Sequence, residues 1–464
     1  MKPEPEWSHL PLYSADSTEE IKKEAAHLEE VAKAPWNKRY GAYLKLTGPG
    51  WMQSAMTLGG GSAVASLTLG ASFGYELLWV QPIAMLAGIV MLAAHSQHTL
   101  ATGVRPFHAM REHINPFIAW TWAIATLLST VIWDFPQVAL AAGMVEDIVQ
   151  AVSGWRPDGL FRSAYLLAIG TLIFSGCTAV AWNYNRGLRG VRVFDRVLKS
   201  LIWLILICFL VVIVRASMDG KVNWMGVIKG FIPSGIPTDR YGVTTVMAAF
   251  GSAVGINMTF LFGYSLLARG WGRSHRGLAK FDLITGMFIP YLLATSLMVI
   301  ATAVTLHGEI PYGSHISPLQ AAETISATGA GLFFGRVLFG IGIFGMGVST
   351  IILHMLVCGF AMCEIFKWPS DGWKYRLSCL LPAPAITGVL LWPTLKTYVA
   401  LPTSAICGVL LPIAYVGWFL LHNNAKFMGA DKPRGAKAWL WNTGMIMAIV
   451  LASASSIYYL SSRF

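Results

Sequence analysis

The stretch TLGGGSAVAS, from Thr57 to Ser66, decides how the first hydrophobic segment of this sequence is built. Three consecutive glycines, Gly59 to Gly61, interrupt a run that is otherwise apolar enough to cross a membrane. Glycine weakens a helix because it leaves the backbone more conformational freedom than other residues do. In lipid, an interrupted helix is tolerated only where the freed backbone is buried in protein or lines a water-filled cavity. The stretch therefore predicts a broken membrane helix that borders such a cavity.

The rest of the chain has the composition of an integral membrane protein. Of its 464 residues, 55% are hydrophobic and only 12% are charged. The apolar residues come in blocks of about 20, the length at which a helix crosses about 30 Å of hydrocarbon. The blocks lack the alternation of apolar and polar residues that barrel strands require. We therefore expect an all-α membrane protein.

The apolar blocks predict about eleven transmembrane helices. They lie near residues 43–70, 75–100, 116–151, 161–182, 195–216, 241–268, 280–306, 332–365, 376–394, 399–422 and 439–461. A second break is expected in the sixth, where Gly251, Gly255 and Asn257 interrupt the apolar run and Thr259 can cap the half-helix that resumes. Paired breaks in corresponding segments are typical of transporters built from inverted repeats. The alternative is that these glycines only allow close helix packing.

The domain organisation follows from this pattern. We expect one transmembrane domain over 43–464, with repeat one at about 43–216, repeat two at about 241–422 and an extra helix at about 439–461. Residues 1–42 lack the apolar core of a signal peptide and are expected to form a cytosolic segment with a short amphipathic helix.

The positive charge of the chain indicates its topology. The formal net charge is +11, and Lys and Arg are concentrated in alternate loops between the spans. By the positive-inside rule, this places the N-terminus in the cytoplasm and the C-terminus outside. The expected location is a bacterial cytoplasmic (inner) membrane, and the charge does not indicate a nucleic-acid partner.

Several stretches, in order, resemble the Nramp family of proton-coupled metal transporters. They are LTGPGWMQSAMTLGGGSAVASLTLGASFGYELLWV, VIKGFIPSGIP, KFDLITGMFIPYLLATSLMVIATAV, GMGVSTIIL and NNAKFMG. The resemblance covers nearly everything from Lys45 to the end. It implies a leucine-transporter-type fold, with two inverted repeats of five helices, helices 1 and 6 broken, and one extra helix.

The motifs that carry the metal chemistry of the family are changed. Where the family has Asp-Pro-Gly-Asn in the first break, this chain has Gly59-Gly60-Gly61-Ser62. Where the family has Met-Pro-His in the sixth span, this chain has Ile256-Asn257-Met258. In the third span, Asp134 is kept but the family's Glu three residues later is Gln137. The resemblance therefore implies a conserved scaffold with an altered site, and no metal site is predicted.

The altered site suits an anion better than a bare dication. A dication desolvated without a carboxylate is very costly, and neither break contains an acidic residue. The half-helices that resume after each break instead present unpaired N–H groups and partial positive charge. We take the substrate-binding residues to be Gly59, Gly60, Gly61, Ser62, Asn257, Met258 and Thr259.

These residues predict a secondary-active transporter that moves a small ion by alternating access. The substrate expected first is an oxyanion such as bicarbonate, by similarity to some Nramp-related proteins that lack the metal motif. The alternative is a proton-coupled carrier of Mn²⁺, Fe²⁺ or Mg²⁺ of the Nramp type. A remote alternative is an intramembrane hydrolase with Ser62 as nucleophile, which would need a base within hydrogen-bond reach.

Four residues within the spans are candidates for binding a coupling ion. Asp134 is an intramembrane carboxylate, which either relays protons or pairs with a neighbouring helix. Ser349 and Thr350 either contribute to a sodium site or bond back to their own helix. His354 either carries a proton or packs as a hydrogen-bonded core residue.

The remaining expectations concern partners. Apart from sodium or a proton as coupling ion, no cofactor is expected. The chain has no nucleotide-binding motif, so ATP is not expected to drive it. Its partners are expected to be a small inorganic ion and the lipid bilayer, with no nucleic acid, and the protein is expected to be a monomer and not an enzyme.

Overall fold

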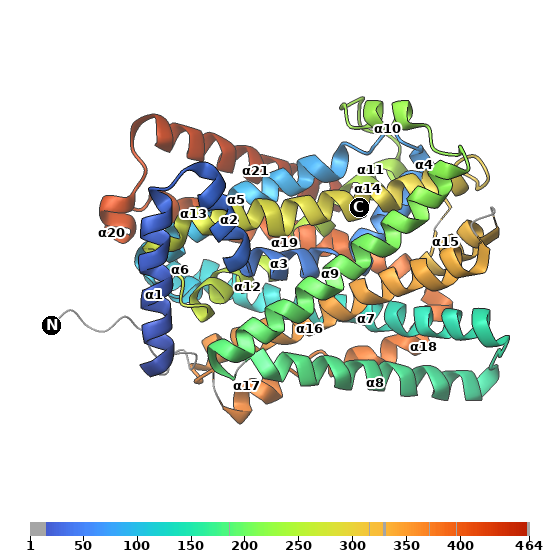
Figure 1. The fold of residues 1–464 in the computed structure, drawn as a ribbon, viewed down its shortest axis with the longest axis horizontal. Helices are drawn as coiled ribbons and strands as arrows, with labels where there is room; N and C mark the ends of the chain where they lie inside the picture. The colour runs from blue at the N-terminus through green and yellow to red at the C-terminus, as the bar shows by residue number, and fades with distance from the viewer. Residues whose placement is uncertain are drawn as a thin grey trace.

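The computed structural model describes residues 15–184, 186–314, 316–327, 331–370, 372–395 and 397–461. The first fourteen residues of the predicted N-terminal segment therefore lie outside the described part. Within it, all regular structure is helical. The long helices run roughly side by side, and α1 (Ala15–Ala32) lies across one end of the bundle, opposite the end that carries α10 (Trp224–Gly230) (Figure 1). We call these the α1 end and the α10 end.

The helices follow one another along the chain with short connections. The first group comprises α2 (Trp36–Leu46), α3 (Pro49–Thr57), α4 (Gly60–Phe73), α5 (Val80–Thr102), α6 (Pro106–His113), α7 (Pro116–Ser153), α8 (Gly159–Tyr184) and α9 (Gly187–Met218). The second comprises α11 (Arg240–Ala253), α12 (Ile256–Ala268), η2 (Arg273–His275), α13 (Arg276–Asp282), η3 (Leu283–Phe288), α14 (Ile289–Thr305), α15 (Pro318–Ile325), η5 (Phe333–Leu338) and α16 (Phe339–Phe366). The last comprises α17 (Trp373–Ser378), η6 (Ala383–Thr387), α18 (Gly388–Leu395), α19 (Thr397–Asn423), α20 (Ala425–Met428), η7 (Gly429–Asp431) and α21 (Gly435–Ser461).

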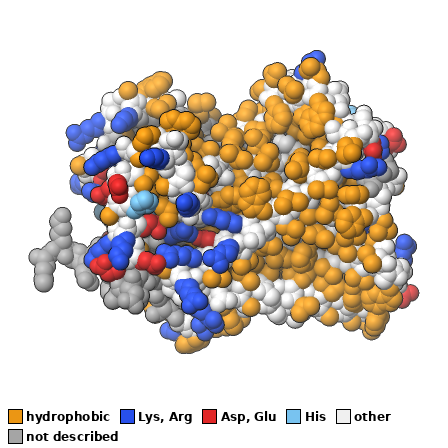
Figure 2. Space-filling view, viewed as in Figure 1, with side chains coloured by type: hydrophobic (Ala, Val, Ile, Leu, Met, Phe, Trp, Pro, Cys, Tyr) orange, Lys and Arg blue, Asp and Glu red, His pale blue; other side chains and the backbone are white. Residues whose placement is uncertain are grey.

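The structure has the character of a membrane protein. Eight of its described helical segments are long and apolar enough to cross a membrane, and Cys407–Asn423 of α19 adds a shorter apolar helix. Figure 2 shows hydrophobic side chains over the middle of the visible face, while Lys and Arg gather mainly at the α1 end. Large apolar side chains such as Leu172, Ile207 and Met447 are exposed on this bundle. Only a hydrocarbon surrounding makes such exposure favourable. The predicted all-α membrane class is confirmed.

The ninth predicted span, residues 376–394, differs from expectation. It is not a continuous helix but passes through α17, η6 and α18. Pro382 and Pro384 lie at the interruption. Proline has no N–H and its ring clashes with the preceding turn, so a regular helix cannot run through this pair.

Both predicted breaks are present and each spans only two residues. Between α3 and α4, Leu58 and Gly59 leave the helical conformation, and Gly59 is extended with φ −121° and ψ −174°. Between α11 and α12, Val254 and Gly255 are both extended. Leu58, Gly59, Val254 and Gly255 are all buried, so both breaks lie inside the bundle rather than against lipid. Their backbone is buried in protein, as a broken membrane helix requires.

The N-terminal helix α1 packs against the α1 end instead of extending into solvent. Leu28 and Val31 are buried beneath it. Glu20 forms an ion pair with Arg192 at 2.8 Å, and Glu24 lies 3.5 Å from His275. Burial alone would raise the pKa of Glu24, but the nearby His275 ring and the charges of Arg269 and Arg192 lower it below its usual value. An anionic Glu24 therefore stabilises the docked helix.

The same end of the bundle fixes the start of half-helix α3. The carboxylate of Asp282 accepts hydrogen bonds from the amides of Gly50, at 2.6 Å, and Gly48, at 3.2 Å. These amides open α3 and have no partner within the helix, so the carboxylate satisfies them and complements the helix dipole. Asp195 pairs with Arg269, which also donates to the carbonyl of Leu46.

Candidate ion-binding site between the two broken helices

The two breaks lie against each other in the middle of the bundle. The hydroxyl of Thr57, the last residue of α3, donates to the carbonyls of Ser252, at 3.0 Å, and Ala253, at 2.7 Å. These carbonyls belong to the last turn of α11, which has no intrahelical donors left for them. One side chain therefore joins the ends of two half-helices that are almost 200 positions apart in the sequence.

The first break is closed by neutral hydrogen bonds. The side-chain oxygen of Gln137 on α7 accepts from the amide of Gly60 at 2.7 Å. The hydroxyl of Ser62 donates to the carbonyl of Thr57 at 2.6 Å and accepts from the amide of Gly59 at 3.1 Å. A Cβ on Gly59 would lie 2.6 Å from the hydroxyl oxygen of Thr350, so only glycine fits there. The glycine run thus lets α16 and α7 approach the backbone closely.

Four amides at the breaks remain without an acceptor in the part of the chain that the structure describes. They belong to Gly61 and Ser62 at the start of α4, and to Ile256 and Asn257 at the start of α12. Amides in the first turn of a helix point outward along its axis and carry partial positive charge. The breaks therefore present two groups of donors to any ligand held between them.

The second break is linked to a buried carboxylate through an imidazole. Asp134 on α7 and His354 on α16 are 0% and 1% exposed, and the Oδ1 of the carboxylate lies 2.7 Å from Nδ1 of the ring. The other ring nitrogen, Nε2, lies 3.2 Å from the side-chain nitrogen Nδ2 of Asn257 on α12. Neutral His354 can accept from Asn257 and donate to Asp134, so three helices share one hydrogen-bonded chain. Sequence reasoning named these three residues separately but did not bring them together.

The remaining residues proposed at the second break are engaged differently from expectation. Thr259 does not cap α12, because Gly255 occupies the capping position and the Thr259 hydroxyl bonds to the carbonyl of Ile256 in its own helix. The indole of Trp122 donates to the same hydroxyl at 2.9 Å. The sulfur of Met258 lies 3.4 Å from the amide of Gly255. The hydroxyl of Thr259 is therefore already occupied, as is that of Ser62.

Ser349 and Thr350 do reach the first break. The hydroxyl of Ser349 donates to the carbonyl of Ala55 at 2.9 Å, and that of Thr350 lies 3.4 Å from the same oxygen. Both hydroxyls also bond back to Met346 in their own helix. The back-bonding expected as one alternative is present, and the sodium site remains a prediction. Neutral oxygens of this kind can coordinate sodium.

The described residues show neither a cluster of acidic, histidine and cysteine ligands nor a serine–base pair at the breaks. Among the described residues, no group of three or more His, Cys, Asp or Glu side chains could hold a metal. In the same residues, no hydrogen bond joins Ser62 to His354, and the Ser62 hydroxyl is bonded to backbone groups of its own break. A nucleophilic serine needs a base in contact with it.

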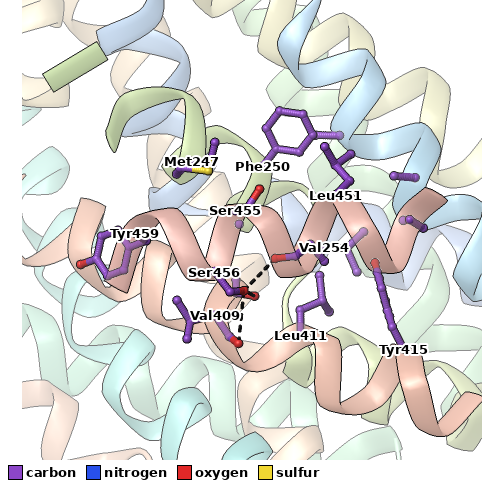
Figure 3. A pocket seen from close by; sticks show the side chains of 17 residues that line it. Met247, Phe250, Val254, Val409, Leu411, Tyr415, Leu451, Ser455, Ser456 and Tyr459 are labelled. Atoms are coloured by element: carbon purple, nitrogen blue, oxygen red, sulfur yellow. Dashed lines mark hydrogen bonds between the residues drawn. The ribbon is translucent and has the colours of Figure 1, made fainter. Parts of the chain in front are cut away.

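A separate apolar cavity lies beside the second break. It is a small, partly open cavity of about 40 Å³ between α5, α11, α19 and α21. Val254 and Gly251 at the end of α11 line one side, and Ser456 on α21 bonds to the carbonyls of Gly408 and Val409 (Figure 3). Its walls are mostly aliphatic and aromatic, so it provides space beside α11 rather than ligands for an ion.

Two broken helices that meet inside an all-helical membrane bundle define a secondary transporter of the leucine-transporter type. The family described as natural resistance-associated macrophage protein-like, or Nramp, matches residues 50–458, and this chain belongs to that family. Its members are transporters and not enzymes. The predicted family, fold class and transporter class are thereby confirmed.

Relatives and solved structures agree with this assignment. The chain is 23% identical over 414 residues to the divalent metal cation transporter MntH of Mycobacterium leprae, covering 87% of this chain and 90% of that one. It is also 23% identical to the manganese transporter pdt1 of Schizosaccharomyces pombe, over 55% of this chain and 45% of that one.

The structural similarity extends beyond the family. A mutant of the Eremococcus coleocola manganese transporter superimposes with a TM-score of 0.71 at 16% identity, covering 92% of this chain and 88% of that one. MhsT in complex with L-phenylalanine gives a TM-score of 0.60 at 15% identity, covering 89% and 98%. At such identities the likeness concerns the fold alone.

Sequence reasoning missed two contributors to the site. Gln137 was noted only as a replaced family residue, yet it holds the amide of Gly60. Its position three residues after Asp134 places both on one face of α7, which is the signal that could have found it. Trp122, which reaches Thr259 from α7, carries no such signal, because most tryptophans in this chain have the appearance of packing residues.

Proposed function

We propose that this protein is a secondary-active transporter of a small oxyanion, bicarbonate first, which binds between the two breaks and crosses by alternating access. The observation that supports this is the set of four buried amides at the starts of α4 and α12 that have no acceptor in the described residues. Oxyanions bind well at helix N-termini, because several N–H groups converge on them and the dipole favours negative charge. The N-terminus and the α1 end are cytoplasmic in this proposal.

The donors to the anion are the backbone amides and the carboxamide of Asn257. Because Ser62 and Thr259 already bond to backbone carbonyls, their hydroxyls keep the half-helices in shape and donate to the ligand only after rotation. The one carboxylate linked to the site, Asp134, faces His354 and not the free amides. Pairing with an imidazole reduces the repulsion that this carboxylate would exert on an anion.

Two positions can couple transport to an ion gradient. The Asp134–His354 pair can take up or release a proton, which changes the charge beside Asn257. The carbonyl of Ala55 and the hydroxyls of Ser349 and Thr350 can hold sodium. In this proposal the monomer carries out the whole cycle, since both breaks belong to one chain.

A divalent cation is the second candidate substrate. It is favoured by the relatives, which are named as divalent metal or manganese transporters. Met258 and Asn257 could provide a sulfur and an oxygen ligand at the second break. Against it stands the lack of a compensating carboxylate at either break, which makes desolvation of a dication costly.

Uptake by proteoliposomes separates the two substrates. We expect radiolabelled bicarbonate to accumulate under an imposed sodium or pH gradient, and manganese to do so no faster than in protein-free liposomes. Saturable manganese uptake without bicarbonate uptake would retire the anion proposal. The result would then favour the second candidate.

A single substitution sharpens this test. Gln137→Glu places a carboxylate next to the first break, so anion uptake should fall by on the order of tenfold, about 1.4 kcal/mol of unfavourable interaction. A cation site would gain affinity from the same change. Gln150→Glu on the same helix, outside the site, is the matched control and should leave uptake unchanged.

A further inference from the structure

Three buried histidines lie together on helices that the proposed site does not use. His95 and His98 on α5 are 0% and 2% exposed, and His422 on α19 is 1% exposed. Nδ1 of His95 lies 2.7 Å from Nε2 of His98, so the two rings share one hydrogen bond. His422 lies close enough to act electrostatically on His98. Ionisable side chains inside a membrane bundle are costly and usually functional.

The outer nitrogens of this cluster have no partner. Nε2 of His95, Nδ1 of His98 and both ring nitrogens of His422 are buried without a hydrogen bond in the described residues. A neutral imidazole carries one N–H and one lone pair, so a hydrogen-bonded pair always leaves one donor and one acceptor at its two outer ends. Leaving such groups unmet in an apolar interior is unfavourable. A structural role alone does not explain why three rings are kept there.

The cluster runs from the α1 end towards the second break. His422 lies one residue from the end of α19, 5.3 Å from the ring of Trp441, over which Lys280 is placed at 5.1 Å. At the other extreme, the outer nitrogen of His95 faces α12, and a Cβ on Gly263 would lie 2.5 Å from it. Glycine at position 263 lets the imidazole of His95 contact half-helix α12, whose first turn contains Asn257.

The surroundings of the cluster are largely aromatic. His95 stacks on Trp418 with ring centroids 4.0 Å apart and lies near Phe262. His98 faces His95, His422 and Phe427. The charged side chain that acts on His422 is Lys280 of α13. No carboxylate of the described residues is paired with these rings.

We propose that His95, His98 and His422 form a second proton-binding site, in which the His95–His98 pair relays a proton between the α1 end and half-helix α12. The role in transport rests on the proposed function, whereas proton binding itself does not. The site is distinct from the Asp134–His354 pair, which lies on α7 and α16.

In one relay step the histidine pair takes up one proton at His98 and releases one proton from His95. When Nε2 of His98 carries the shared hydrogen, Nδ1 of His98 is bare and Nε2 of His95 carries a hydrogen. A proton that binds Nδ1 of His98 makes an imidazolium, which passes its Nε2 hydrogen to Nδ1 of His95. His95 then releases its Nε2 hydrogen towards α12. Both rings finish neutral in the opposite tautomers, and the reverse sequence returns them.

The test is a pH titration of the full-length protein in lipid nanodiscs, with nitrogen-15 histidine observed by NMR. We expect a hydrogen-bonded pair of like tautomers, both Nε2–H or both Nδ1–H, that disappears in both His95→Gln and His98→Gln. We expect this pair to take up one proton as the pH is lowered from about 8 to about 3. His307→Gln is the control, because His307 lies at the end of α14 near the carbonyl of Ala71. If all three rings stay neutral over this range, the proposal is overturned.

A flux measurement connects the site to transport. Substrate-driven proton flux in proteoliposomes should be on the order of tenfold slower in His98→Gln, while substrate binding by the purified protein stays within about twofold. His422→Asn, on another helix, provides the same reading if the α5 variants do not fold. Unchanged flux in all these variants would overturn the relay. Absence of bicarbonate flux in the wild type would instead count against the proposed function, and the NMR titration would still decide proton binding.

Discussion

The two breaks are alike in backbone geometry but differ in the chemistry that holds them. At the first, the partners are neutral: Gln137 accepts from Gly60, and Ser349 donates to the carbonyl of Ala55. At the second, Asn257 is joined to His354 and through it to Asp134. Amides and hydroxyls stay uncharged at every physiological pH, whereas an imidazole–carboxylate pair can gain or lose a proton. The first break can therefore fix a geometry, and only the second can respond to a proton.

The largest expected effect comes from separating the titratable pair. Asp134→Asn or His354→Gln leaves one buried polar partner unmatched, and breaking a buried pair costs about 3–5 kcal/mol. We expect a marked loss of thermal stability in detergent and loss of proton-coupled uptake. Because the two residues act as a unit, the double variant should lose much less than the sum of the single losses. Additive losses in unfolding measurements would show that the pair is not a unit.

Replacing the glycine of each break by alanine tests how differently the two breaks are packed. Gly255→Ala puts a Cβ 2.6 Å from Asn257 and 2.8 Å from the Trp133 ring, and Gly59→Ala puts one 2.6 Å from the Thr350 hydroxyl. Overpacking of this kind costs about 1–3 kcal/mol. Thr350→Ala should rescue Gly59→Ala, because it removes the obstructing oxygen, and should not rescue Gly255→Ala.

The control for these variants lies on α8. A Cβ on Gly176 would meet nothing within 4 Å, so Gly176→Ala should be neutral or slightly stabilising. Unfolding curves in detergent measure all of these changes. Failure of Thr350→Ala to restore Gly59→Ala would mean that the first break is closed by contacts other than that hydroxyl.

A smaller effect is expected from Ser349→Ala at the first break. It removes one hydrogen bond to the carbonyl of Ala55, which contributes about 1 kcal/mol. If the first break holds sodium, the sodium concentration for half-maximal uptake should rise while the pH dependence of uptake stays unchanged. A shift of the pH profile instead would remove the distinction between a fixed first break and a titratable second one.

The smallest effect is expected at the α1 end, where α3 begins and α12 ends. Glu24 has a pKa held below its usual value of 4.5 by His275 and nearby arginines, against the opposing effect of burial. Its contribution to docking of α1 is therefore full above that usual value and is lost as the pH falls through the lowered pKa. Glu24→Gln should cost no more than about 1 kcal/mol at neutral pH. Proteolysis of α1 should increase slightly in the variant at neutral pH and match the wild type in acid.

Several features of this protein could be read from the sequence. Blocks of about 20 apolar residues dictate membrane helices, because unpaired backbone is not tolerated in lipid. The glycines at 59–61 and at 251 and 255 marked both breaks, and the structure places the breaks at Gly59 and Gly255. The ordered stretches from Leu46 to Gly429 indicated the family, which the match over residues 50–458 confirms.

The sequence was weaker on the ninth span and on which side chains are free. Pro382 and Pro384 lie within an apolar block. Hydropathy alone therefore predicted one helix where the structure has three short helical segments. Ser62 and Thr259 were expected to donate to a ligand, yet local backbone carbonyls lie within reach of both. Short polar side chains satisfy the nearest backbone group first, and periodicity does not show which group that is.

Only the tertiary structure decided which polar groups meet. Asp134, Asn257 and His354 lie on three helices, and His98 and His422 lie on two, with long stretches of chain between them. Hydrophobic patterning specifies that each helix is buried, because burial follows from the transfer of apolar surface. It does not specify rotation or depth, which are set by close packing and by the pairing of buried polar atoms. The sequence thus determined a broken-helix membrane transporter, and packing determined which polar groups meet inside it.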